Sequence, residues 1–163
     1  MPEEVTPVSH AATPPETGAT ALRTGLGAVP YARVTDAPID EADVRAAVDS
    51  PDCGAIVMFH GVIRDHDGGE SVRSLDYSAH PEAERFLTDL VREESERIGL
   101  RLAAVHRIGS LVVGDVALVA AAAAPHRREA FEAIEHMVER IKHEVPIWKR
   151  QHYTSGTSDW VGL

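Results

Sequence analysis

The sequence predicts an α+β fold in a single domain with a mostly antiparallel sheet. Three observations favour this class. Apolar or alternating runs typical of strands recur along the chain, two long segments have the 3.6-residue period of a helix, and the two kinds of segment do not alternate as regular βαβ units. A chain of 163 residues, 44% of them hydrophobic, suits one domain with its own core.

The composition indicates a cytoplasmic protein and excludes two broad classes, membrane-spanning proteins and general nucleic-acid binders. Residues 1–20 lack the basic and apolar regions of a secretory signal, and no apolar run reaches the roughly 18 residues that span a bilayer. Cys53 is the only cysteine, so no internal disulfide can form. Because the formal net charge is −10, an anionic ligand needs a local basic cluster.

The elements of the first half are expected in the following order. Residues 1–28, rich in Ala, Thr, Pro and Gly, predict a disordered tail before a folded domain at 29–163. Asp40 is in position to be the N-cap of a short helix. Strands are expected in "YARVTDAPID" before that helix, in the apolar run 54–63 and in the alternating run 71–79, with a polar loop "RDHDGGE" between the last two.

The second half is expected to hold the two long helices. The first begins at Pro81 and ends at Gly99, and its apolar stripe is Phe86, Leu87, Leu90, Val91 and Ile98. Two strands, "LRLAAVHRIG" and "SLVVGDVALVAAAAA", follow, with Gly114-Asp115 as a turn or bulge. The second helix begins near Pro125 and ends before Pro146, and its stripe is Ala130, Phe131, Ile134, Met137, Val138 and Ile141.

The chain contains two lysines, Lys142 and Lys149, beside fourteen arginines. Lys142 is expected in the last turn of the second helix, and Lys149 in the extended segment that follows Pro146. A helix end, a proline corner and a strand can direct both ammonium groups to one pocket, where each lowers the pKa of the other. A structural role remains open, because Lys142 also suits the helix dipole and an ion pair with Glu139.

Two further groups of cations are candidates for binding an anionic ligand. His126 and Arg127 lie at the start of the second helix, where free N–H groups favour anions. They are roughly 25 Å from Lys142 along the helix, so the two ends can share a pocket only across a two-fold dimer axis. Arg64 ends an apolar strand at a flexible loop, a usual place for a ligand-binding arginine. No histidine spacing indicates a metal site.

Several segments together resemble the large, catalytic subunit of molybdopterin synthase. They are "GAIVMFHGVIRDH", "HRIGSLVVGD", "PHRREAFEAIEHMVERIKHEVPIWK" and the late "DW", and "IKHEVPIWKR" is the most specific. The resemblance covers roughly residues 30–163. It implies an α/β-hammerhead fold and a homodimer that binds a small ubiquitin-like sulfur carrier at each end, forming a heterotetramer. The carrier's C-terminal Gly-Gly thiocarboxylate would give two sulfurs to cyclic pyranopterin monophosphate, without a resident cofactor or metal.

The resemblance also implies roles for residues that match the family's motifs. Lys142 and Lys149 match its two active-site lysines. The substrate-binding residues implied beside them are Val62, Ile63, Arg64, His126, Arg127, Arg150 and Gln151, with His126 and Arg127 supplied by the neighbouring subunit. Two features depart from the family. Ala124-Pro125 replaces a small pair with a serine before His126, and the chain ends three residues after Trp160, without a basic arm.

Two other functional classes fit the residues. One is a non-catalytic scaffold for a ubiquitin-like partner, in which the lysines serve as docking charges and tolerate replacement by arginine. The other is a Schiff-base enzyme acting on a phosphorylated carbonyl compound, in which borohydride would trap Lys142 without a protein partner.

Overall fold

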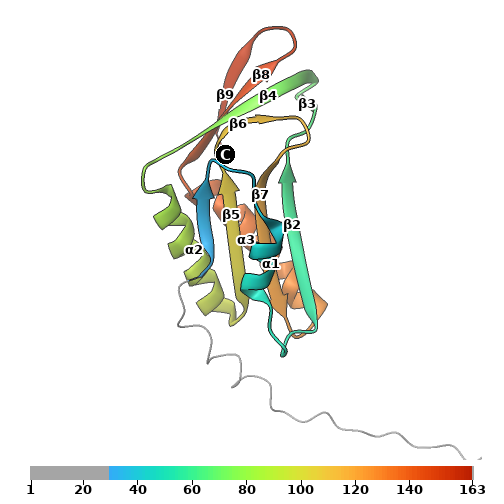
Figure 1. The fold of residues 1–163 in the computed structure, drawn as a ribbon, viewed down its shortest axis with the longest axis vertical. Coiled ribbons are helices and arrows are strands. Elements are labelled where there is room, and N and C mark those ends of the chain that lie inside the picture. The colour runs from blue at the N-terminus through green and yellow to red at the C-terminus, as the bar shows by residue number, and fades with distance from the viewer. Residues whose placement is uncertain (1–29, 163) are drawn as a thin grey trace, which may run out of the picture.

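The computed structural model describes residues 30–162, which form two sheets placed end to end, with three helices beside the first (Figure 1). The tail predicted at 1–28 lies outside these residues. The elements in chain order are β1 (Ala32–Thr35), α1 (Glu41–Val48), β2 (Ala55–Val62), β3 (His66–Asp67), β4 (Glu70–Ala79), α2 (Ala83–Ile98), β5 (Arg101–Arg107), β6 (Gly109–Val112), β7 (Val116–Ala124), α3 (Arg127–Glu144), β8 (Ile147–Tyr153) and β9 (Ser158–Gly162). Within the described part, no helix is both long and apolar enough to span a bilayer.

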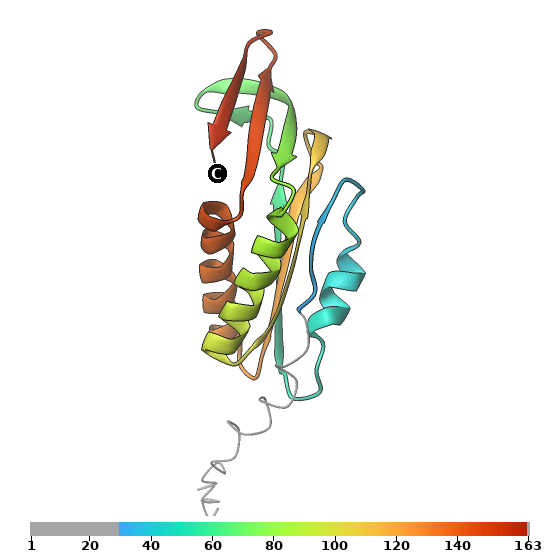
Figure 2. The ribbon, with the colours of Figure 1, turned by 90° about the vertical axis from the view of Figure 1, so that its left-hand side faces the viewer.

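The first sheet has the strand order β1-β5-β7-β2, and in it only β1 and β5 pair in parallel. Helices α2 and α3 cover one face of this sheet, and α1 covers part of the other (Figure 2). The predicted α+β class with mostly antiparallel strands is therefore confirmed. The predicted N-cap is confirmed as well, since the Asp40 side chain accepts a hydrogen bond from the backbone N–H of Ala42.

The central strand β7 explains how helices can cover both faces closely. Its residues Ala120–Ala124 are fully buried, and successive side chains point to opposite faces of the sheet. Ala120, Ala122 and Ala124 belong to the core formed with α2 and α3, whereas Ala121 and Ala123 belong to the core under α1. Because alanine carries only a methyl group, each helix can pack close to the sheet.

The second sheet differs from the sequence prediction in three ways. The segment "SLV" lies in a separate strand, β6, which pairs with β4, and the chain crosses to the first sheet at a turn in which Gly114 has a φ of 93°. The predicted polar loop contains the short strand β3, paired with the start of β4 through a Gly68-Gly69 turn. Strand β9, which pairs with β8, was not predicted.

The long helices lie where the sequence places them, with three corrections. Helix α2 begins at Ala83 rather than Pro81 and ends, as predicted, at Gly99 in the left-handed conformation. Two predicted stripe residues are exposed, Phe86 by 41% and Phe131 by 61%, so each buried stripe is narrower than the periodicity indicates. The Phe86 ring instead lies under the Arg85 guanidinium, 4.9 Å from its centroid.

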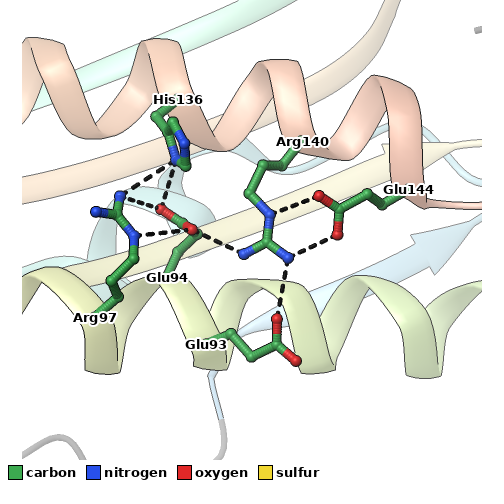
Figure 3. A network of polar contacts seen from close by, with 6 residues as sticks. All are labelled: Glu93, Glu94, Arg97, His136, Arg140 and Glu144. Carbon is green, nitrogen blue, oxygen red and sulfur yellow. Dashed lines mark hydrogen bonds and ion pairs between the residues drawn. The ribbon is translucent and has the colours of Figure 1, made fainter.

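A buried carboxylate joins α2 to α3 (Figure 3). The side chain of Glu94 on α2 is only 1% exposed, and it accepts hydrogen bonds from Arg97 on its own helix and from Arg140 and His136 on α3. Arg140 also pairs with Glu93 and Glu144. Burial alone would raise the pKa of Glu94, but the hydrogen bonds from the three cationic or ring donors outweigh it and lower the pKa to about 2. The network therefore fixes the packing of the helix that carries Lys142.

Candidate active site

The two lysines lie on either side of the predicted proline corner. Lys142 is exposed in the last turn of α3, which ends at Glu144 and is followed by Pro146. Lys149 is the third residue of β8 and is half-buried. The predicted sequence of helix end, corner and strand is confirmed. The ion pair considered for Lys142 is absent from the described residues, because Glu139 pairs instead with His143 at 3.7 Å.

The electrostatics of Lys149 show which groups surround it. Burial lowers the pKa of its amine, and the positive charges of Arg64 and Lys142 lower it further, whereas the negative charge of Asp67 opposes them. Arg64 and Lys142 therefore lie near enough for their charges to act on the Lys149 ammonium. We call Arg64, Lys142 and Lys149 the basic cluster. A partly buried amine with a lowered pKa is better able to exchange a proton near neutral pH than an exposed lysine.

A hydrogen-bonded chain connects Arg64 to the interior of the second sheet. Its guanidinium donates from Nη2 to Oδ1 of Asp67 over 2.6 Å, and the Gln151 amide donates from Nε2 to Oδ2 of Asp67 over 2.8 Å. The same amide nitrogen is 3.3 Å from the hydroxyl of Tyr153. Gln151 is only 3% exposed and lies two residues beyond Lys149, so both side chains project from the same face of β8.

The two residues before Arg64 differ in burial, and this difference fixes the position of the arginine. Ile63 is 4% exposed and packs in a core with Val72, Leu75, Leu111, Ala117 and Tyr153. Val62, by contrast, is 51% exposed beside an irregularity in the pairing of β2 with β7. A buried side chain immediately before Arg64 holds its backbone in place while the guanidinium extends to the surface.

Arg150 is the predicted site residue that the structure directs away from the basic cluster. In β8, residues 149 and 151 share one face and residue 150 projects from the other. Arg150 donates to the Ser158 hydroxyl and lies 5.8 Å from the centre of the Trp160 ring, both on β9. Within one chain, Arg150 therefore does not line the same pocket as Lys149.

His126 and Arg127 lie at the opposite end of α3 from Lys142, as the sequence predicts. His126 is the N-cap residue, with an extended backbone and no capping hydrogen bond from its side chain, and Arg127 is the first helical residue. Eighteen residues of helix span about 27 Å at 1.5 Å per residue. One chain therefore does not bring this pair to the basic cluster.

Asp67 and Tyr77 are the members of the site that the sequence analysis missed. Tyr77 is the register partner of Lys149 across β4 and β8, and burial raises the pKa of its hydroxyl. The signal for Asp67 was present in the sequence, because Asp-Gly-Gly favours a two-residue hairpin turn that ends a strand at the aspartate. Tyr77 carried no such signal, since strand register depends on the tertiary pairing.

One other place for a ligand is less suitable for an anion. A hollow of about 560 Å³ between α2 and α3 is lined by Glu129, Glu132, Glu135 and Glu139, beside Arg97 and His136, and by none of the predicted site residues. Its four carboxylates would repel a phosphate. Among residues 30–162, no group of three His, Cys, Asp or Glu side chains is arranged to hold a metal ion. The basic cluster is therefore the best candidate site for an anionic substrate.

Comparisons with known proteins show the family of the chain. The sequence model of the MoaE protein family matches residues 34–144. Molybdopterin synthase catalytic subunit 1 of Mycobacterium tuberculosis is 46% identical over 138 residues, covering 83% of this chain and 93% of the relative. The catalytic subunit of Bacillus subtilis is 37% identical over 131 residues, which cover 79% of this chain and 83% of that protein.

A solved structure extends the likeness from sequence to fold. The crystal structure of molybdopterin synthase from Staphylococcus aureus superimposes with a TM-score of 0.74 at 36% sequence identity, over 82% of this chain and 97% of that one. The resemblance carried by "IKHEVPIWKR" and the other motifs is thus confirmed. The chain belongs to the MoaE family, whose curated members matched here are molybdopterin synthase catalytic subunits.

Proposed function

We propose that this chain is the catalytic subunit of a molybdopterin synthase, a sulfurtransferase of molybdenum cofactor biosynthesis. The observation that carries the proposal is the basic cluster, in which two cations act on the half-buried amine of Lys149 in a protein with a net charge of −10. The sulfur donor is the C-terminal thiocarboxylate of a small carrier protein, and the acceptor is cyclic pyranopterin monophosphate. Both are anions, and both need local positive charge.

The chemistry assigns different tasks to the cations. Arg64, Lys149 and the neighbouring chain's Arg127 bind the anionic groups of the two substrates. Lys142 lies against the carbonyl of the thiocarboxylate, where its amine serves as an acid, a base or an electrostatic stabiliser. The carrier supplies the sulfur, so no protein thiol is required. Burial raises the pKa of the Cys53 thiol, which makes Cys53 a poor nucleophile.

The active form is a homodimer, with one carrier bound at each end. The length of α3 supports this assembly, because His126 and Arg127 can join the basic cluster only from a second chain. Residues 29–163 form the catalytic domain. A cytoplasmic location agrees with the single cysteine of the chain, which is free.

The direct test is to mix the protein with a thiocarboxylated carrier and the pterin precursor and to detect the dithiolene product by mass spectrometry. Product formation supports the proposal. If no product forms with a carrier shown to be thiocarboxylated, the sulfur-transfer function is wrong. Borohydride trapping of Lys142 by a phosphorylated carbonyl compound, without the carrier, would instead favour a Schiff-base enzyme.

A mixed dimer tests whether two chains share each site. We expect Arg127→Ala and Lys142→Ala homodimers to keep at most about 1% of the wild-type activity, because every site in them lacks one group. In a heterodimer of the two variants, one site receives both groups from unmutated positions, so we expect about half the activity of a wild-type dimer. Native mass spectrometry measures the heterodimer fraction. Confirmed heterodimers without activity would place both groups in one chain's site and contradict the shared arrangement.

A further inference from the structure

A single carboxylate lies among the cations of the basic cluster. Asp67 ends β3, and its side chain is 28% exposed. Each of its oxygens has a partner, with Arg64 on Oδ1 and the buried amide of Gln151 on Oδ2. Hydrogen bonds that lower the pKa of Asp67, the one from Gln151 most of all, keep the carboxylate ionised at neutral pH. The group is therefore an anion at neutral pH, and it connects a surface arginine to the interior.

The partner in the interior fixes the position of Asp67. Gln151 lies opposite Leu75 in the pairing of β4 with β8, and its side chain is almost fully buried. The Gly68-Gly69 turn places Asp67 directly opposite Glu70, at the start of the same strand β4. Asp67 is thus held from two directions, by the hairpin and by β8.

Arg64 depends on Asp67 for its own position. Its side chain is 68% exposed, and Asp67 is its ion-pair partner among the described residues. A free arginine on a surface samples many rotamers, and ordering it on substrate binding costs conformational entropy. Contact with Asp67 at Nη2 restrains the guanidinium while its other N–H groups remain able to donate to an anion.

We propose that Asp67 is a positioning residue of the anion-binding site, holding the Arg64 guanidinium beside Lys149 and tying the β3–β4 hairpin to β8 through Gln151. The identity of the anion, a thiocarboxylate or a pterin phosphate, rests on the proposed function. The positioning itself rests on the contacts within this chain. A second consequence follows from charge, since Asp67 partly neutralises the positive charges of Arg64 and Lys149.

Lysine-selective 13C labelling tests the charge of Asp67 without any substrate, because the chain has two lysines and gives two side-chain signals. The charged groups that act on Lys149 are Asp67, Arg64 and Lys142, and the residue opposite Lys149 on strand β4 is the neutral Tyr77. Removing the anion lowers the pKa of Lys149, so we expect Asp67→Asn to move the titration midpoint of its signal to lower pH. The Lys142→Arg variant assigns the two signals.

Asp65→Asn is the matched control, because Asp65 lies in the same segment but pairs with His66 over 2.6 Å. We expect the midpoint of Lys149 in this variant to equal that of the wild type. Equal midpoints in all three proteins would overturn the proposal, and so would a shift of the same size in Asp65→Asn.

A double-mutant cycle in the complete enzyme tests whether Asp67 acts through Arg64. With the thiocarboxylated carrier present, we expect Asp67→Asn to raise KM for the pterin precursor about tenfold, the size of a lost charged hydrogen bond, and to change kcat much less. Arg64→Ala is expected to raise KM at least as much, and the double variant is expected to match Arg64→Ala. Additive effects on KM would show that Asp67 does not act through Arg64.

The two experiments separate failure of this inference from failure of the proposed function. If the wild-type protein forms no product, the proposed function is wrong. The role of Asp67 is then still decided by the lysine titration and by a titration with inorganic phosphate. We expect Asp67→Asn to bind phosphate more weakly than the wild type, because Arg64 is no longer held in place. Comparing the thermal unfolding of Asp67→Asn with that of Asp65→Asn shows whether Asp67→Asn still folds. Unchanged phosphate affinity with an unchanged midpoint overturns the inference.

Discussion

Replacing Lys142 with alanine is expected to lower the rate of sulfur transfer about 100-fold, the usual size of a lost acid–base or electrostatic group. Lys142→Arg is expected to remain at least about tenfold slower than the wild type, which is about 1.4 kcal/mol of activation free energy. Arginine keeps the positive charge but cannot release a proton near neutral pH. Single-turnover assays with the carrier and the pterin precursor measure both rates.

The surroundings of Lys142 make this variant a clean test of chemistry. Lys142 is exposed in the last turn of α3 and has no ion pair among the residues that the structure describes. Arginine there suits the helix dipole as well as lysine does, so folding and carrier binding should persist. His143→Ala is the matched control, since it alters the same turn at a residue paired with Glu139, and it should transfer sulfur at the wild-type rate. Near-normal turnover in Lys142→Arg would contradict a catalytic role and favour the scaffold.

The local geometry around the two lysines could be predicted from the sequence because local signals fix it. The apolar period of α3 ends beside Lys142, Pro146 stops the helix, and the extended run after it holds Lys149. Which side of the sheet each side chain of β8 faces could not be predicted equally well. Arg150 follows Lys149 directly in the chain, but alternation along β8 sends it to β9 and away from the basic cluster.

Long-range pairing explains the remaining differences. The "SLV" segment is apolar enough to continue toward β7, and nothing local shows that it pairs with β4 in the other sheet. Phe86 and Phe131 fit the helical period, but their exposure depends on how far the neighbouring elements extend over each helix. The link from Asp67 to Gln151 joins residues 84 positions apart, so only the folded chain reveals it.

Glu94→Gln is expected to lower the free energy of unfolding by about 3 kcal/mol, the lower end for breaking a buried charged network. Glutamine keeps the shape of glutamate but removes the charge that holds Arg97, Arg140 and His136 between α2 and α3. Glu93→Gln is the matched control, because Glu93 pairs with the same Arg140 but is 64% exposed. It should cost less than about 1 kcal/mol. Urea unfolding at pH 7 measures both losses.

The dependence on pH gives this prediction a second, independent readout. The pKa of Glu94 lies near its ordinary value of 4.5 in the unfolded chain and is lowered to about 2 in the folded one. The folded state therefore binds fewer protons in this range, and the stability contributed by Glu94 is fully present above about pH 4.5 and is lost as pH falls toward 2. The stability of Glu94→Gln should fall less steeply than that of the wild type across this window, so their difference narrows in acid. A constant difference from pH 7 to pH 2 would mean that the loss comes from packing and that the carboxylate of Glu94 does not hold the two helices together by its charge.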